Sequence, residues 1–369
     1  MITSSSKMNI SQTIYAILAG TSFILTFIYS ETAIECARSA LSLCAKTIIP
    51  SLFPFIIISE IVVYSGLGNV IGSVFSKLFN KLFGISAPAV CAVILGALCG
   101  FPIGTKIVLS LLDSGSIDKS EAERLITFCN NPSPSFLINI VGLSLYSSSV
   151  AGVIFYCVTL MNSALIGIIS NMVIPCPSNH FKSLNSKKPH NTLTFASAVS
   201  SSIPSILSIC SYVIFFSVLM GCIEKILTSL NCTKNISIFI YSIIELSGGV
   251  AKSATLGNNI LGLCITSFGI GWSGLSVHCQ MQSLCNGYNL NLKNYFISKL
   301  ILGFMNSLAI ALIYHFMPSF FFPCNSTISV IYLPGLHEAW SIFSVCSFAI
   351  GTTFYILRRK HKSTVSIIY

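Results

Sequence analysis

A lysine follows directly on a glycine- and proline-containing interruption inside a long apolar stretch, residues 86–112. At its centre stands the run Gly100, Phe101, Pro102, Ile103, Gly104, Thr105, Lys106. Glycine and proline there free backbone hydrogen-bonding groups that lipid cannot satisfy, and a lysine at that depth is costly unless it faces a cavity or a partner. An interrupted helix with a buried charge is typical of a transport site, so we expect Lys106, Gly100 and Gly104 to contact an anionic solute. Alternatively, Lys106 reaches the headgroups along its flexible stem.

A single carboxylate, Glu60, stands in a second apolar stretch at 48–66. A carboxylate is expensive within a membrane, so we expect Glu60 either to pair with Lys106 or to carry a coupling proton. The alternative is that its helix ends nearby and the side chain lies at the membrane surface. Glu60 is therefore the predicted charge partner of the site.

A second interruption is predicted at 129–135, where Asn-Asn-Pro-Ser-Pro cannot continue a helix. Its amides and hydroxyl, Asn130, Asn131 and Ser133, are candidate hydrogen-bonding groups for the solute; the alternative is a plain loop of turn-forming residues. Upstream, Ser120 followed by Glu123 predicts a capping box and a helix that starts near Ser120.

The C-terminal half contains a third interruption at 269–276, within Gly-Ile-Gly-Trp-Ser-Gly-Leu-Ser. If the following residues are helical, Ser273, Ser276 and Gln280 share one face and can bind the solute. Trp272 is either an aromatic wall of the site or an interface anchor. His278 is a candidate gate or proton relay, although a lone histidine is more often structural. Glu245 and Lys252, seven residues apart, can share a helix face.

The composition sets the class of protein. Of the 369 residues, 53% are hydrophobic and only 8% are charged, and the mean hydropathy is +0.83, whereas a soluble domain is about 25% charged. We therefore predict an all-α polytopic membrane protein with roughly eight to ten spans. Residues 135–174 are long enough for two crossings, and the first apolar segment is expected to be a retained span rather than a signal peptide. The predicted segments are 12–30, 48–66, 86–112, 135–174, 203–230, 236–266, 294–317 and 337–357.

The net charge of +10 does not indicate nucleic-acid binding, because the basic residues cluster at the ends of apolar segments. The clusters at 182–188 and 358–362 predict a cytoplasmic loop at 175–192 and a cytoplasmic C-terminus, with contact to anionic lipid at most. The spacing of the 15 cysteines suggests neither disulfides nor a metal site. We expect no cofactor and no enzymatic activity, since no catalytic motif is present; the sequence leaves a homo-oligomer open.

The basic loop divides the chain into halves, 1–174 and 193–369, that resemble each other weakly. Ser-Leu-Phe-Pro at 51–54 resembles Ser-Ser-Ile-Pro at 201–204, and the glycine-rich run at 100–104 resembles that at 269–274. Chance is the alternative, because apolar sequences resemble each other easily. Interrupted segments at corresponding positions of two halves predict a binding site between them.

Four segments together resemble the YlbJ-type, or SpoVV-type, sporulation integral membrane proteins, over roughly residues 10–355. These carry the nucleoside-recognition Gate domain and are distantly similar to concentrative nucleoside transporters. The segment at 121–134 departs from the family, with Cys-Asn-Asn-Pro where an Asn-Thr-Ser-Gly-like interruption is expected. The other three segments are 51–60, 100–106 and 271–280.

The resemblance implies transport of dipicolinic acid across the outer forespore membrane during spore formation. Dipicolinate is a small aromatic dianion that suits a lysine, amide donors and an aromatic wall. Transport of a nucleoside or another metabolite is the first alternative. A spore-envelope membrane protein that transports nothing is the second.

Overall fold

The computed structural model describes residues 10–65, 67–173 and 195–321, and in these ranges every regular element is a helix. The prediction of an all-α polytopic membrane protein is confirmed, because five stretches are long and apolar enough to cross a membrane. The predicted loop at 175–192, the basic cluster at 358–362 and the apolar segment at 337–357 lie outside the described residues. The five stretches are Ser30–Val62, Ser149–Val173, Phe195–Ser229, Ile260–Leu284 and Lys293–Phe316.

The first part of the chain forms helices that lead into the first hairpin. Its two arms are residues 89–113 and 119–145, and each arm is interrupted between two helices. Both predicted interruptions are present: non-helical backbone separates α5 from α6 at 100–102, and α7 from η2 at 127–134. Of the predicted pair of crossings in 135–174, only α8 is long enough to span, since η2 has 11 residues. The elements are α1 (Ile10–Ile28), α2 (Ser30–Leu43), η1 (Cys44–Ile48), α3 (Ile49–Tyr64), α4 (Leu67–Phe83), α5 (Ala89–Cys99), α6 (Ile103–Asp113), α7 (Lys119–Ile126), η2 (Ser135–Leu145) and α8 (Ser149–Val173).

Helix α7 starts where the sequence predicts, but the predicted capping box is wrong. Asp118 is the N-cap, and its carboxylate accepts a hydrogen bond of 2.7 Å from the backbone N–H of Glu121. Glu123 instead accepts from the backbone N–H of Asn291, at 2.8 Å. Aspartate caps a helix as well as serine does, and here it stands two residues earlier.

The second part of the chain forms the second hairpin, whose two interrupted arms are residues 234–254 and 260–284. The apolar segment 236–266, expected as one span, is three helices, because Glu245 is extended (φ −136°, ψ 124°) and a turn follows α11. The third predicted interruption is present at Ser273. The elements are α9 (Phe195–Ser229), α10 (Lys234–Ile244), α11 (Leu246–Ala254), α12 (Ile260–Trp272), α13 (Gly274–Leu284), α14 (Lys293–Phe316) and η4 (Pro318–Phe321).

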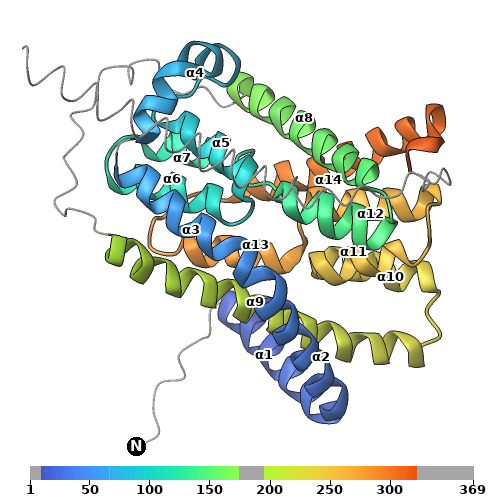
Figure 1. The fold of residues 1–369 in the computed structure, drawn as a ribbon. Helices are drawn as coiled ribbons and strands as arrows, with labels where there is room; N and C mark the ends of the chain where they lie inside the picture. The colour runs from blue at the N-terminus through green and yellow to red at the C-terminus, as the bar shows by residue number, and fades with distance from the viewer. Residues whose placement is uncertain (1–9, 66, 174–194, 322–369) are drawn as a thin grey trace, which may run out of the picture.

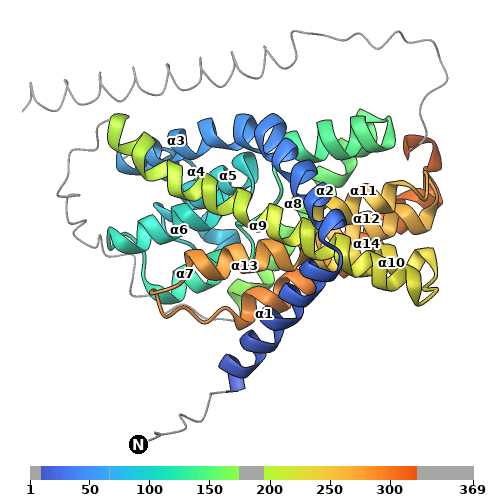
Figure 2. The same cartoon turned by 90° about the horizontal axis from the view of Figure 1, so that it is seen from below.

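The two hairpins meet inside the bundle, where α6 contacts α13 and η2 contacts α11, and α9 runs along one side of it (Figures 1 and 2). The order of elements repeats: a helix with an internal proline (α3 or α9), an interrupted hairpin, then a long helix (α8 or α14). By this order, the interruption at 100–102 corresponds to Glu245, and that at 127–134 corresponds to Ser273. The sequence comparison had paired 100–104 with 269–274 instead.

Within each hairpin the two interruptions pack backbone against backbone. Gly100 has a φ of +85°, and a Cβ there would lie 2.7 Å from the backbone nitrogen of Ser133. Gly274 has a φ of +76°, and its Cβ would lie 2.9 Å from the backbone nitrogen of Leu246. Only glycine combines this conformation with this closeness. Both glycines therefore fix how the two arms of their hairpin meet.

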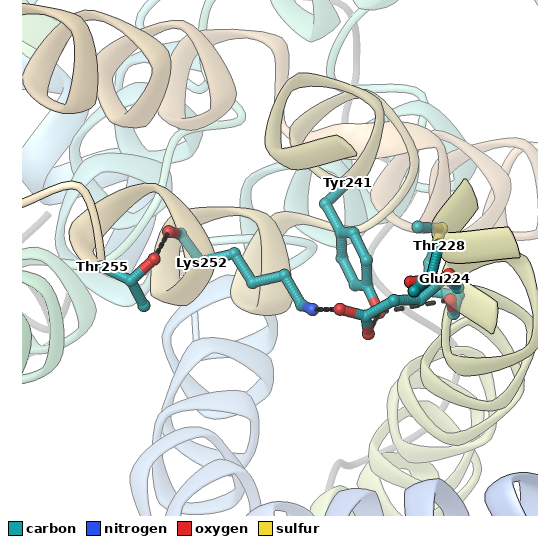
Figure 3. A network of polar contacts seen from close by, with 6 residues as sticks. Glu224, Thr228, Tyr241, Lys252 and Thr255 are labelled. Carbon is teal, nitrogen blue, oxygen red and sulfur yellow. Dashed lines mark hydrogen bonds and ion pairs between the residues drawn. The ribbon is translucent and has the colours of Figure 1, made fainter. Parts of the chain in front are cut away.

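A polar contact ties the second hairpin to α9 (Figure 3). Lys252 of α11 forms an ion pair with Glu224 of α9 and lies 4.2 Å above the ring of Tyr241. The Tyr241 hydroxyl donates to the same carboxylate at 2.7 Å. Glu245, which the sequence placed on a shared face with Lys252, instead accepts hydrogen bonds from the backbone N–H groups of Ser247 and Gly248 and caps α11.

Candidate functional site

Lys106 lies in the first turn of α6, directly after the interruption. Its ammonium nitrogen is 2.6 Å from a carboxylate oxygen of Glu60 on α3. The same nitrogen donates a hydrogen bond of 2.9 Å to the hydroxyl of Ser205 on α9. The lysine side chain is 18% exposed and the glutamate side chain 9%. The contact expected between these two side chains is thus present, and Lys106 is neutralised within the bundle.

A small pocket borders Lys106, between α3, α6, α9 and α13. Gln280 brings a side chain of the second hairpin to it, and α6 is held against α13 by a contact of 2.6 Å between the Thr105 hydroxyl and the Met281 sulfur. The cavity volume is about 10 Å³, which is room for about one water molecule. A larger solute enters only if the helices separate. The pocket is lined by Ile56, Pro102, Ile103, Lys106, Ser205, Ser208, Ile209, Gln280 and Leu284.

A second lysine, Lys299 of α14, lies near the same interruption and was not singled out in the sequence. It is fully buried, and its ammonium group donates to the backbone oxygen of Asn130. The ammonium nitrogen is 5.8 Å from the centre of the Phe101 ring, whereas the neighbouring Pro102 lines the Lys106 pocket. Among the described residues, Lys299 has no carboxylate within ion-pair distance.

Three polar side chains join Lys299 in what we call the buried polar cluster: Asn130, His278 and Tyr295. The His278 Nδ1 atom is 3.0 Å from the Tyr295 hydroxyl, and its Nε2 atom has no hydrogen-bond partner among the described residues. The side-chain amide of Asn130 lies beside the Tyr295 hydroxyl, but neither its oxygen nor its nitrogen has a partner with full hydrogen-bond geometry among the described residues. Tyr295 precedes Lys299 by one helical turn, so both lie on the same face of α14.

The other predicted residues of the first hairpin hold its interruptions in place. The Asn131 amide donates to the backbone oxygen of Phe128 and to the hydroxyl of Ser163, both at 2.9 Å. The Ser133 hydroxyl accepts from the backbone N–H of Phe136 at 3.2 Å. Gly104 packs against the 129–133 backbone, as Gly100 does, and neither lines the pocket.

Some predicted residues of the second hairpin support its backbone. Others lie at the Lys106 pocket or in the buried polar cluster. The Trp272 indole donates to the backbone oxygen of Ile243 at 2.9 Å, and its ring centre lies 4.3 Å from that of His278. Ser273 is the interruption itself, with a left-handed φ of +76°. Ser276 is buried on α13, outside the pocket lining. The structure thus brings Lys106, Glu60 and Gln280 to one place, and Asn130 and His278 to another.

In the part of the chain that the structure describes, no group of three histidine, cysteine or acidic side chains is placed to hold a metal ion. The candidate site therefore consists of lysines, amides, hydroxyls and one carboxylate. Such a set can bind an anion or an uncharged polar solute through ion pairs and hydrogen bonds.

The comparison with characterised proteins finds a relative of the chain. The chain is 24% identical over 339 residues to the sporulation integral membrane protein YlbJ of Bacillus subtilis (strain 168), a match that covers 80% of this chain and 82% of the relative. The chain is a homologue of a YlbJ-type protein. The family resemblance stated from four sequence segments is thereby confirmed, and the relative's name agrees with the apolar helices in assigning a multi-pass membrane protein. No family model and no solved structure matches the chain.

Proposed function

We propose that the chain is a membrane transporter of a small anionic solute, and that the solute is dipicolinic acid crossing the outer forespore membrane. The observation that carries the proposal is the Lys106 pocket, in which an interrupted helix presents a cation beside Gln280 from the other half of the chain. Interrupted helices that meet within a membrane bundle are a common construction of transporter sites.

In the resting, solute-free state of the proposed transporter, Lys106 is paired with Glu60. A carboxylate of the solute competes with Glu60 for the ammonium group, so that binding releases the Glu60 carboxylate. Glu60, buried and without its partner, then takes up a proton or another cation, because an isolated carboxylate is unstable there. Solute binding and cation uptake are coupled in this scheme through one shared ion pair.

The setting in sporulation is inferred from the relative, which is called a sporulation integral membrane protein. The first alternative, a nucleoside or another neutral metabolite, is favoured by one observation. Because Glu60 neutralises Lys106, the pocket also offers uncharged hydrogen-bonding groups, such as Gln280 and Ser208, without a net charge. A competition measurement separates the two.

The experiment is uptake of radiolabelled dipicolinate by liposomes that contain the purified protein. We expect uptake well above that of protein-free liposomes, reduced at least tenfold by Lys106→Ala. Lys77→Ala, on the exposed surface of α4, is the matched control and should retain wild-type uptake. Equal amounts of inserted protein must be verified for each variant.

Three outcomes contradict parts of the proposal. Normal uptake by Lys106→Ala rules out the charge anchor. Uptake that excess uridine abolishes and excess picolinate does not favours the nucleoside alternative. No uptake of any tested anion or nucleoside contradicts transport.

A further inference from the structure

Lys299 is a buried cation whose described surroundings lack a counter-charge. Its side chain has no exposed surface, its ammonium group donates to the Asn130 backbone oxygen, and the Phe101 ring centre lies 5.8 Å from the ammonium nitrogen. Burial of a charged group without an opposite charge is costly, so proteins pair such groups or use them at functional sites. A carboxylate brought by a ligand is the partner that this place lacks.

The neighbouring side chains complete a donor set for a carboxylate. Asn130 is fully buried, and its amide nitrogen has no hydrogen-bond partner; His278 is 2% exposed, and its Nε2 atom has none either. If the Tyr295 hydroxyl donates to Nδ1, then Nε2 carries the proton and is a second donor. An ammonium group and two N–H donors match the oxygens of one carboxylate.

We propose that Lys299, Asn130 and His278 bind one carboxylate group of the transported solute. The inference rests on the proposed function and adds a second contact to it. Segment 100–102 lies between the two contacts, since Phe101 borders Lys299 and Pro102 lines the Lys106 pocket. When this segment moves aside, a solute with two carboxylates reaches both lysines, whereas a monocarboxylate reaches one at a time. The protein therefore selects small dicarboxylates.

The test compares dipicolinate, which has two carboxylates, with picolinate, which has one on the same ring. Each competes for uptake of labelled dipicolinate by liposomes that contain the full chain. We expect the wild type to prefer dipicolinate by tenfold or more, and Lys299→Met to lose most of that preference while its affinity for picolinate changes little. Lys293→Met is the matched control, because it removes a lysine from the exposed start of the same helix.

A second variant keeps the test valid if Lys299→Met does not fold. Asn130→Asp is nearly isosteric and places a resident carboxylate beside Lys299, where it pairs with the ammonium group and excludes the solute's carboxylate. We expect a correctly inserted protein with the same loss of preference. Wild-type preference in either folded variant overturns the proposal, as does an equal loss in Lys293→Met.

The failure of this inference is distinguishable from failure of the proposed function. If the wild type transports no anion at all, the proposed function is wrong. If the wild type transports dipicolinate and the Lys299 and Asn130 variants select like the wild type, only the second contact is wrong.

Discussion

The two lysines beside the first interruption differ in what lies opposite their ammonium groups. Lys106 meets the Glu60 carboxylate at 2.6 Å and keeps some exposure. Lys299 is fully buried and meets a backbone oxygen and uncharged side chains. The first lysine is part of an ion pair, whereas the second has no carboxylate of the described residues within ion-pair distance.

This difference implies that the two lysines, both proposed to bind the solute, differ in their effect on the stability of the empty protein. When an ion pair is already made in the empty protein, removal of one partner lowers stability, because the other charge is left buried without a partner. A charge without a counter-charge costs stability in the empty protein and is useful only when a ligand arrives. The comparison is therefore open to direct tests on stability.

The largest effect is expected from Lys106→Met. It leaves Glu60 without a partner, so we expect a loss of about 3 kcal/mol in the free energy of unfolding. Lys299→Met removes an uncompensated charge together with one hydrogen bond, so these terms offset each other and the net change is about 1 kcal/mol or less. Unfolding in detergent micelles, followed by circular dichroism, measures both. Equal losses at the two lysines would remove the distinction.

The double variant Lys106→Met with Glu60→Gln is the control for this prediction. It removes both charges, so its loss should be smaller than the sum of the two single losses. Additive losses would mean that the two side chains do not interact in the membrane protein, whatever their separation.

A smaller effect is expected where segment 100–102 separates the two lysines. Gly100→Ala forces a side chain into a φ of +85° and against the Ser133 backbone, so we expect a loss of about 2 kcal/mol and weaker dipicolinate uptake. Gly115→Ala shares the left-handed conformation, with a φ of +67°, but has nothing within 4 Å of its Cβ. Its loss should be about 1 kcal/mol, without an effect on uptake.

If the two glycine variants lose equal stability, the closeness of the two interruptions has no energetic consequence. If Gly100→Ala loses stability but takes up dipicolinate normally, the segment does not control access to either lysine.

The interruptions were predictable because they rest on residues with local rules. Gly100 and Pro102 stand close together and disfavour a continuous helix, and the prolines at 132 and 134 do the same for the second arm. A single proline is not sufficient, since Pro54 and Pro204 lie inside α3 and α9. The break at Glu245 was missed, since neither adjoining residue, Ile244 or Leu246, is a proline or a glycine and glutamate carries no such rule. What ends α10 there is the Glu245 carboxylate capping the next helix, a contact that only the folded backbone reveals.

The candidate site was predictable only where a charge stood beside such an interruption. Lys106 follows one directly, and Glu60 was the nearest buried opposite charge, so their pairing could be anticipated. Lys299 lies in an ordinary apolar helix, and its position in the 294–317 segment was the one available signal. Its closeness to Asn130, 169 residues away in sequence, depends on the packing of α14 against α7 and its following interruption.

The smallest effect is expected from a third lysine, Lys252, which is paired but half-exposed. Its side chain is 31% exposed and that of Glu224 is 40% exposed, so solvent weakens their attraction and Lys252→Met should cost about 1 kcal/mol or less. Glu224→Gln should cost about the same, and neither variant should change the preference for dipicolinate over picolinate. A large loss of uptake in both would instead show that the attachment of α11 to α9 takes part in transport. Together with the other two, this lysine separates pairing from burial: Lys106 has both, Lys252 has only a partner, and Lys299 has only burial. Because each of the two buried lysines is proposed to bind one carboxylate of the solute, the preference for dipicolinate should fall in the Lys106 and Lys299 variants and stay unchanged in Lys252→Met.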